Sequence, residues 1–306
     1  MKTTTQPSRS SLPRLWACLW RQPRNQIEIE PDRLDGKRAL VTGGNGGIGR
    51  ETAGWLYELG AHVTIACRNE SKGRAAIEQF RRHDGPEAAV LPCDLADVHS
   101  VESAASNAQR YDIVVHNAGV APTSYAETKQ GFESAFGVNV LGHVALTDAL
   151  LHRGCIADGA RVVWLTGDIY ITIDDCTSDY RYRGAVGGWR AYSRSKLGSL
   201  WMRHAYAAEQ PDIRWYAAHP GVVNSGLAKG GPQWLRSRLM ISTRDGARTS
   251  VACAAQANLQ PCYLHNTLGI MDLRSDDPGA NRERATALLE HCRTLLAGPE
   301  SRRLAG

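Results

Sequence analysis

Short apolar segments alternate with helix-like segments along most of this chain. Apolar runs of five or six residues lie at 38–42, 62–67, 88–92, 112–116, 160–165 and 213–218. Helical patterns lie between and after them, at 49–59, 71–83, 98–110, 132–151, 191–209 and 243–257. Buried strands that alternate with helices form a parallel sheet with helices on both faces. The sequence therefore predicts the α/β class, as a single doubly wound domain whose central parallel β-sheet is flanked by helices.

The first 36 residues do not share this pattern. They are polar, contain prolines and show no sustained hydrophobic period, so we expect an N-terminal arm at 1–36 and one domain at 37–306. A length of 306 residues would allow two domains, but α/β sheets of about 250 residues commonly fold as one. Residues 12–20 (LPRLWACLW) are interrupted by Pro13 and Arg14. This interruption favours an arm over a signal peptide or a segment lying on a membrane surface.

Charge and cysteine content narrow the class of protein. The 36 Lys and Arg residues exceed the 31 Asp and Glu residues by only five. This excess does not predict nucleic-acid binding, although it suits an anionic cofactor. No run approaches the roughly 20 apolar residues of a membrane-spanning helix, so we expect no integral membrane span. The eight cysteines form no CxxC pair, which argues against a metal site and favours reduced thiols in a cytoplasmic protein.

The first apolar run leads into a glycine-rich turn. The sequence GGNGGIG occupies 43–49, and a helical pattern begins there. Glycines permit a tight turn and let the backbone approach a pyrophosphate, which binds the free N–H groups at the helix start. Three spacings of the motif fit, with glycines 44, 46 and 49, with 43, 46 and 49, or with 43, 47 and 49. The strand before the turn and the helix after it indicate a dinucleotide-binding Rossmann fold.

The end of the second apolar run bears on which dinucleotide is bound. It reads Cys67-Arg68-Asn69, where folds of this kind that bind NAD carry an acidic residue for the ribose 2′-hydroxyl. An arginine suits a 2′-phosphate, which a carboxylate would repel. Arg50 and Lys72 add positive charge nearby in the sequence. We therefore predict NADP as the cofactor in preference to NAD.

Tyr192 and Lys196 are four residues apart in a helical segment, so they share one face of that helix. A phenol normally loses its proton near pH 10, and a neighbouring ammonium lowers that pKa. Such a tyrosine can donate or accept the proton that accompanies hydride transfer at an alcohol or carbonyl carbon. We therefore predict Tyr192 as the acid and base of a redox reaction.

The order of these motifs resembles that of the short-chain dehydrogenases/reductases. Besides the glycine turn and the Tyr192–Lys196 pair, the chain has Asp94, the run Asn117-Ala118-Gly119, Asn139 and Pro220-Gly221. The likeness covers most of the chain and favours the short form of the superfamily over the longer epimerase form. The runs VTGGNGGIGRETA and ACRN are most similar to the branch of retinol dehydrogenases and WW-domain oxidoreductases. We expect neither a WW module nor that branch's membrane anchor.

The resemblance implies which residues bind the cofactor. The glycine turn would shape the pyrophosphate site, and the residues after the third and fourth apolar runs would hold the adenine and line the path of the nucleotide. Val223 and Ser225 would meet the nicotinamide carboxamide, with Ser225 in place of the family's usual threonine. Together with Arg68, the predicted cofactor-binding residues are Gly43, Asn45, Gly47, Ile48, Gly49, Asp94, Leu95, Asn117, Gly119, Tyr192, Lys196, Val223 and Ser225.

The resemblance also implies a catalytic group. Tyr192 would be the acid and base, and Lys196 would bind the nicotinamide ribose. Asn139 would kink its helix and hold a water in a proton relay to Lys196. The family also places a serine before the catalytic tyrosine, where it donates a hydrogen bond to the substrate oxygen.

Gly167 stands in place of that serine. Removing one such donor from an enzyme costs about 10²–10³ in rate. Thr166 is our candidate to replace it, provided that the strand end bulges, because adjacent strand residues otherwise face opposite sides. Asp168 and Tyr170 are the other candidates, and the absence of any replacement is the remaining possibility.

Two segments beyond the strand ends indicate the substrate. Residues 169–190 and a predicted lid around 224–243 are rich in aromatic and aliphatic residues. Such segments build the substrate pocket in this fold. We therefore predict an NADP-dependent oxidoreductase that acts on the alcohol or ketone of a hydrophobic small molecule. By resemblance we expect a homodimer or homotetramer.

Two other functions remain open. Gly167 makes a catalytically weak or inactive NADP-binding sensor or scaffold the main alternative. An epimerase or dehydratase that uses the same tyrosine and lysine with a retained cofactor is a third.

Overall fold

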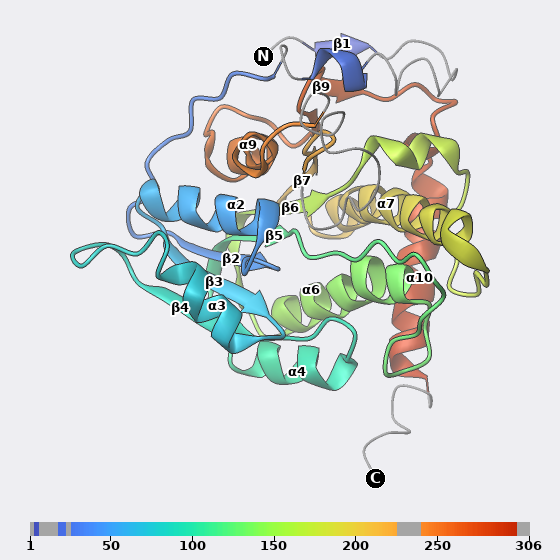
Figure 1. The fold of residues 1–306 in the computed structure, drawn as a ribbon, viewed down its shortest axis with the longest axis horizontal. Coiled ribbons are helices and arrows are strands. Elements are labelled where there is room, and N and C mark those ends of the chain that lie inside the picture. The colour runs from blue at the N-terminus through green and yellow to red at the C-terminus, as the bar shows by residue number, and fades with distance from the viewer. Residues whose placement is uncertain (1–2, 6–17, 23–25, 225–239, 299–306) are drawn as a thin grey trace.

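The computed structural model describes residues 3–5, 18–22, 26–224 and 240–298. In this part of the chain, nine strands form one sheet in the order β1-β9-β8-β7-β6-β5-β2-β3-β4 (Figure 1). Neighbouring strands are parallel except for β8 and β9. The strands are β1 (Thr3–Thr5), β2 (Arg38–Thr42), β3 (His62–Cys67), β4 (Ala88–Pro92), β5 (Tyr111–His116), β6 (Ile156–Leu165), β7 (Arg214–His219), β8 (Tyr263–His265) and β9 (Gly269–Asp272).

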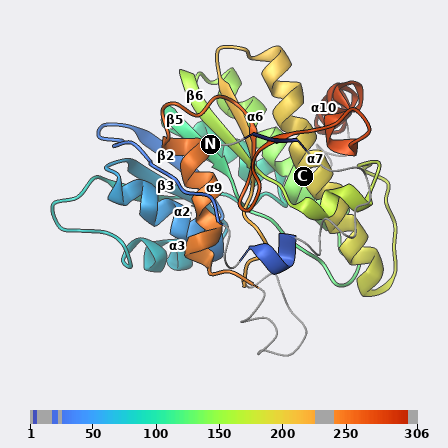
Figure 2. The ribbon, with the colours of Figure 1, turned by 90° about the horizontal axis from the view of Figure 1, so that it is seen from above.

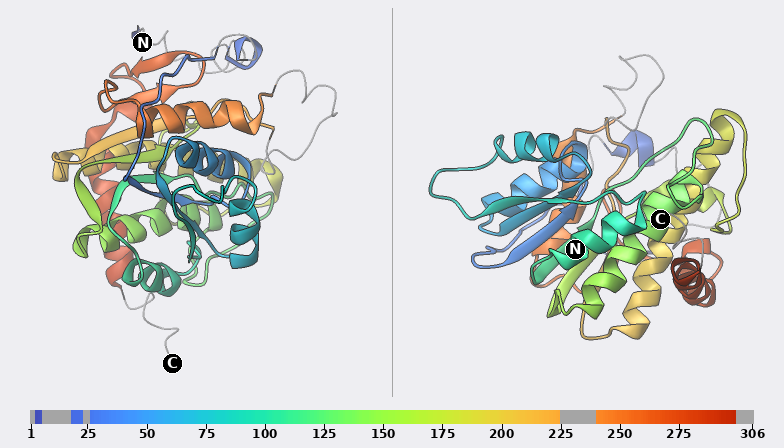
Figure 3. Two further views of the ribbon diagram at one scale, coloured as in Figure 1. Left: turned by 90° about the vertical axis from the view of Figure 1, so that its left-hand side faces the viewer. Right: turned by 90° about the horizontal axis from the view of Figure 1, so that it is seen from below.

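Helices cover both faces of this sheet, which confirms the predicted doubly wound α/β fold (Figures 1 and 2). The helices α2, α3 and α9 lie on one face, while α4, α6 and α7 lie on the other; α10 packs outside α7 (Figure 3). The helices are α2 (Gly47–Glu58), α3 (Glu70–Ile77), α4 (Val98–Ser106), α5 (Ser134–Phe136), α6 (Gly142–His152), α7 (Gly184–Glu209), α9 (Thr243–Ala255) and α10 (Arg282–Ala297), with a π-helical turn at Gly137–Leu141 and 3₁₀ turns at Asp168–Thr172 and Pro278–Ala280.

The alternation of side chains along the strands divides the interior into two cores. In β6, Val162 and Trp164 point into the core beneath α6 and α7, whereas Val163 and Leu165 point into the core beneath α2 and α9. All four are buried, as expected for a central strand covered on both faces. The near-continuous apolar runs of the sequence follow from this double burial.

Some elements differ from those expected from the sequence. The helix α7 begins at Gly184 instead of 191, and α3 ends at Ile77 instead of 83. The extra turns of α7 contain Gly184, Gly187 and Gly188, which are poor helix formers, so tertiary packing overrides local propensity there. No element was predicted for β1, β8, β9 or α10.

From β2 the chain first continues to β3 and β4 on one side of the sheet, and it then crosses to β5 on the other side of β2. The strand β3 lies on one side of β2 and β5 on the other, so a crevice opens at their carboxyl ends. This crevice is where the predicted dinucleotide site lies. The division into an arm at 1–36 and a domain at 37–306 stays a prediction.

One helical stretch of the described residues, Ser134–His152, is long and apolar enough to cross a membrane. Its apolar window is 72% buried inside the protein. Core helices of globular domains have the same length and composition, so this stretch fits its place against the sheet. The eight cysteines are free thiols.

Candidate active site

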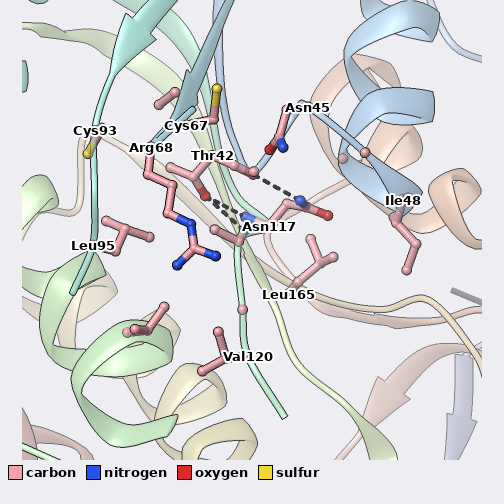
Figure 4. A pocket seen from close by; sticks show the side chains of 18 of the residues that line it. Thr42, Asn45, Ile48, Cys67, Arg68, Cys93, Leu95, Asn117, Val120 and Leu165 are labelled. Carbon is pink, nitrogen blue, oxygen red and sulfur yellow. Dashed lines mark hydrogen bonds between the residues drawn. The ribbon is translucent and has the colours of Figure 1, made fainter. Parts of the chain in front are cut away.

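A cavity of about 770 Å³ lies at the carboxyl ends of β2 to β6 (Figure 4). Its volume is within the usual range for ligand pockets, about 300–1,000 Å³. The structure brings most of the predicted site residues to its wall. These are Gly43, Asn45, Gly47, Ile48, Gly49, Arg68, Asp94, Leu95, Asn117, Gly119, Thr166, Tyr192 and Lys196.

The glycine turn between β2 and α2 leaves no room for side chains at two positions. A Cβ atom on Gly49 would lie 2.3 Å from Asn117 Nδ2, and one on Gly43 would lie 2.9 Å from the Cα atom of Ala118. Gly43 and Gly47 also have positive φ angles of 68° and 54°, which glycine adopts at no steric cost. These constraints select the spacing of glycines 43, 47 and 49 among the three that fit the sequence.

A hydroxyl at the end of β2 holds the loop that forms the opposite wall. The backbone N–H groups of Asn117 and Ala118 both donate to Thr42 Oγ1, at 2.9 and 3.0 Å. The amide Nδ2 of Asn117 donates to the carbonyl of Thr42 at 2.9 Å (Figure 4). The ends of β2 and β5 are therefore fastened together at the place where a pyrophosphate would lie.

Two cations also line the cavity. Arg68 extends into it from the end of β3 (Figure 4), and Lys72 lines it from the first turn of α3. Neither side chain has a hydrogen bond or an ion pair within the described residues. Arg50, in contrast, donates to Gln79 and Glu51 and does not line the cavity. Arg68 and Lys72 therefore offer unpaired positive charge to an anionic ligand.

Asn139 lies in the π-helical turn Gly137–Leu141, so its helix is irregular where the sequence predicted a kink. Its side chain pairs with the backbone of Val120, accepting from the N–H at 2.8 Å and donating to the carbonyl at 3.0 Å. It also donates to Ser195 Oγ at 2.9 Å, and Ser195 donates to the carbonyl of Tyr192 at 2.8 Å. Asn139 thus ties the 117–120 loop to the catalytic turn of α7, but it does not line the cavity.

Tyr192 and Lys196 lie together on α7, with Lys196 Nζ 5.4 Å from the centre of the Tyr192 ring. The ammonium donates to the carbonyl of Leu165 at 3.1 Å. Burial raises the pKa of Tyr192 to about 12 and lowers the pKa of Lys196 to about 8. Burial therefore outweighs the expected lowering of the phenol pKa by the ammonium, because desolvation disfavours the charged form of each group.

Thr166 lines the cavity, but its hydroxyl has another partner in this structure. It donates to the backbone carbonyl of Lys196 at 2.7 Å, and a hydroxyl has only one proton to donate. Thr166 would have to give up this bond to donate to a substrate oxygen, and its role as the replacement donor stays a prediction. Gly167 is in extended conformation, and an added Cβ there would come no closer than 3.5 Å to Lys196.

The other candidate donors are turned away from the cavity. Asp168 is buried and accepts hydrogen bonds from the Tyr263 hydroxyl at 3.2 Å and from His265 Nε2 at 2.9 Å. Tyr170 is fully buried and donates to Asp277 at 3.3 Å. Neither lines the cavity, so both side chains serve packing and hydrogen bonding behind the strand ends.

Three of the described residues, Cys18, Asp168 and His265, have the spacing of metal ligands, with the candidate ligand atoms within 4.8 Å of one another. The ring of His265 argues against a metal there. Its Nδ1 accepts the backbone N–H groups of Thr267 and Leu268, so Nε2 carries the proton that is donated to Asp168. A protonated nitrogen has no lone pair for a metal ion.

The loop after β7 was expected to meet the nicotinamide. Pro220 lines the cavity, whereas Val223 is buried, and a Cβ atom on Gly246 would lie 2.6 Å from its Cγ2. The side chain of Gln22 pairs with the backbone of Val222, donating to its carbonyl at 3.0 Å and accepting from its N–H at 2.8 Å. Ser225 and most of the predicted lid at 224–243 lie outside the described residues.

Several lining residues were missed in the sequence. Val120 follows the Asn117-Ala118-Gly119 run directly, and Leu165 is the last residue of β6. The rule that ligands bind beyond the carboxyl ends of parallel strands would have found both. The missed residues of the wall include Thr42, Val120, Val138, Leu165 and Pro220.

Comparison with known proteins shows the family of this chain. The family described as short chain dehydrogenase matches residues 37–235. Retinol dehydrogenase 12 of Mus musculus is 36% identical over 245 residues, which are 75% of this chain and 76% of that protein. Dehydrogenase/reductase SDR family member 13 of Bos taurus is 34% identical over 298 residues, which are 90% of this chain and 78% of that protein.

Solved structures show the same fold. A protein from Mycobacterium Paratuberculosis is 28% identical and superimposes with a TM-score of 0.70. The match covers 87% of this chain and 95% of that one. A short chain dehydrogenase from Burkholderia cenocepacia, in complex with NADP, is 21% identical, with a TM-score of 0.60 over 78% of this chain and 99% of that one. From the family match and these relatives, the chain belongs to the short-chain dehydrogenase/reductase family of oxidoreductases.

Proposed function

We propose that this protein is an NADP-dependent oxidoreductase that transfers hydride between the nicotinamide and the alcohol or ketone carbon of a hydrophobic small molecule. The observation that carries the proposal is that the glycine turn, Arg68, Tyr192 and Lys196 all line one cavity. This shared lining supports a site that holds a phosphorylated cofactor beside a proton donor.

The cavity fits a phosphorylated dinucleotide. The glycine turn lines the cavity at the start of α2, whose N–H groups attract anions such as a pyrophosphate. Glycine at positions 43 and 49 lets this turn pack closely against Asn117 and Ala118. The unpaired cations of Arg68 and Lys72 suit a 2′-phosphate, since an arginine binds phosphate in a bidentate manner. When bound, the nicotinamide supplies or accepts the hydride.

Tyr192 donates or accepts the proton that accompanies hydride transfer. A phenol with a pKa of about 12 keeps its proton at neutral pH, so it can donate that proton to the oxygen of a bound ketone. The ammonium of Lys196 stabilises the phenolate that remains, and the bond from Asn139 to Ser195 fixes the turn of α7 that carries Tyr192. In the alcohol-oxidising direction the same phenolate accepts the proton.

Two large apolar side chains in the turns of α7 before Tyr192 are exposed. Trp189 lies three residues before Tyr192, and Val186 lies three residues before Trp189. Their exposed fractions are 47% and 76%, which is unusual for large apolar side chains beside a catalytic turn. These side chains, and the similarity to retinol dehydrogenases, favour a bulky apolar alcohol or ketone.

Cofactor titration followed by turnover tests the proposal. We expect the protein to bind NADPH more tightly than NADH and to reduce members of a panel of hydrophobic ketones, and we expect Tyr192→Phe to lose at least about a hundredfold in rate, as for a general acid. Equal rates for the wild type and Tyr192→Phe would refute it.

A catalytically weak or inactive NADP-binding sensor remains the second candidate, because of Gly167 and the proton that Thr166 donates to Lys196. NADPH binding without hydride transfer to any ketone or from any alcohol of the panel would favour this function.

A further inference from the structure

The hydroxyl of Thr42 is used to its full hydrogen-bonding capacity. It accepts from the backbone N–H groups of Asn117 and Ala118, and these bonds take both of its lone pairs. Its proton can go to His143 Nε2 at 2.9 Å or to the carbonyl of Val115 at 3.4 Å. The shorter contact assigns the proton to His143, so Nε2 of that ring is the acceptor.

The other nitrogen of the same ring gives the same assignment independently. His143 Nδ1 lies 3.2 Å from the backbone carbonyl of Asn139, and a carbonyl can only accept, so Nδ1 carries the proton. The ring is 1% exposed, and burial lowers the pKa of His143 to about 4. His143 is thus a neutral imidazole with its proton on Nδ1.

The surroundings hold this ring in place. It contacts the rings of His116 and Trp164 edge to face, with centroid distances of 4.8 and 5.8 Å. Thr147 donates to the carbonyl of His143 at 2.8 Å. A packed, neutral ring with one donor and one acceptor spans the distance between β2 and the π-helical turn.

We propose that His143 is a positioning residue, which joins the Asn139 turn to the Thr42 hydroxyl and so keeps the cofactor wall and the catalytic helix at a fixed spacing. The inference rests on the proposed function, since it concerns the same cavity. On one side the chain of bonds runs from His143 through Thr42 to the Asn117 loop; on the other it runs from His143 to Asn139 and through Ser195 to Tyr192. A misplacement of about 1 Å at such a site can cost about a hundredfold in rate.

Two substitutions test the hydrogen bonds of His143 Nδ1 and His143 Nε2 separately. The amide of His143→Gln reaches the position of Nε2, so it can accept from Thr42 and loses the bond to Asn139. The amide of His143→Asn occupies the position of Nδ1, so it keeps the bond to Asn139 and leaves the Thr42 hydroxyl without its acceptor. The dissociation constant for NADPH and the kcat for ketone reduction are measured for both, together with their thermal midpoints.

We expect opposite effects on the two constants. His143→Gln should keep the NADPH dissociation constant within about twofold and lower kcat by about tenfold, the size of one lost hydrogen bond. His143→Asn should raise the dissociation constant by about tenfold and keep kcat within about twofold. Tyr206→Phe, which removes a buried hydroxyl bonded to Asp148 away from the cavity, should lower the thermal midpoint and change neither constant.

Equal losses in both constants for both histidine variants would overturn the inference, because a purely structural role cannot distinguish the nitrogens. If one variant does not fold, the other decides: a wild-type kcat for His143→Gln, or a wild-type NADPH dissociation constant for His143→Asn, would overturn the inference. If the wild type binds NADPH without turnover, the NADPH dissociation constants decide: the constant should rise for His143→Asn and not for His143→Gln, and equal constants would overturn the inference. A wild type that neither binds nor turns over refutes the proposed function and this inference with it, whereas an active wild type with two matching variants refutes this inference alone.

Discussion

The hydroxyl of Thr166 donates its proton to the backbone carbonyl of Lys196 across 2.7 Å. This bond joins the end of β6 to the helix that carries the catalytic tyrosine. It also uses the proton that a substrate oxygen would otherwise receive. The residue after it, Gly167, has no side chain to donate in its place.

Gly167→Ser should therefore raise the rate. A Cβ at this position meets no atom closer than 3.5 Å, so serine fits without displacing its neighbours. We expect kcat for ketone reduction to rise by about 10²–10³, the size of the effect of one such donor. Gly167→Ala is the matched control and should stay at the wild-type rate. Identical rates for the serine and alanine variants would show that the reaction already has its second donor.

Gly49→Ala should abolish cofactor binding. Its Cβ would lie 2.3 Å from Asn117 Nδ2 and 2.5 Å from the carbonyl oxygen of Gly43, so the turn and the loop must separate. We expect the NADPH dissociation constant to rise by at least about a hundredfold, since the backbone donors move away from the phosphates. Gly46→Ala, in the same turn with open space around its Cβ, serves as the control and should bind within a few fold of the wild type.

Arg68→Ala should reduce the preference for NADP. Removing an unpaired guanidinium that reaches a 2′-phosphate should weaken NADPH binding by about ten- to a hundredfold, the range for a charge-assisted hydrogen bond. NADH binding should change little, because NADH has no phosphate there. Isothermal titration with both cofactors measures the ratio. Arg50→Ala is the comparison variant, because Arg50 is bonded to Gln79 and Glu51; an equal loss in both variants would show that Arg68 has no specific role.

Ketone reduction should slow at alkaline pH. Burial lowers the pKa of Lys196 to about 8, so its ammonium is present below pH 8 and is lost as the pH rises through that value. Without this charge the phenolate of Tyr192 is less stable and proton donation is slower. The logarithm of kcat/KM, measured from pH 6 to pH 10 at saturating NADPH, should fall above about pH 8. A flat profile up to pH 10 would contradict the role given to Lys196.

Arg161→Met should destabilise the fold without touching the site. The guanidinium of Arg161 is 5% exposed and donates to the carbonyls of Cys253, Gln256 and Ala257 at the end of α9. Leaving these buried acceptors unpaired should lower the free energy of unfolding by about 3 kcal/mol. Urea titration measures the change, and Arg214→Met, an exposed arginine bonded to Gly159, should cost less than about 1 kcal/mol.

The fold could be predicted because its strands are buried on both faces. The runs ending at Thr42, Cys67 and Pro92 have the same bounds in the structure as in the sequence pattern, since apolar runs between turn residues are informative for central strands. The start of α7 could not be predicted, because Gly187 and Gly188 have low helix propensity and tertiary contacts stabilise the helix there. The strands β8 and β9 have only three and four residues, too few for a periodic signal.

The cofactor half of the site was more predictable than the catalytic half. The glycine turn and Arg68 act through backbone conformation and charge, which sequence spacing reveals. The direction of a hydroxyl proton does not follow from spacing, so the bond from Thr166 to the carbonyl of Lys196 could not be predicted. The pKa of Tyr192 also depended on burial more than on its neighbour Lys196, and burial at this depth is a property of the folded protein. His143 has no motif that distinguishes it from an ordinary core histidine.

Gln22 holds Val222 by a two-way amide pairing, although the family match begins only at residue 37. A protein shortened to begin at Lys37 would keep every motif of the family and lose this brace on the segment beside Pro220. The boundaries of a conserved domain and of a working catalyst therefore need not coincide in this chain, and the segment before the first motif belongs with the enzyme when it is produced for assay.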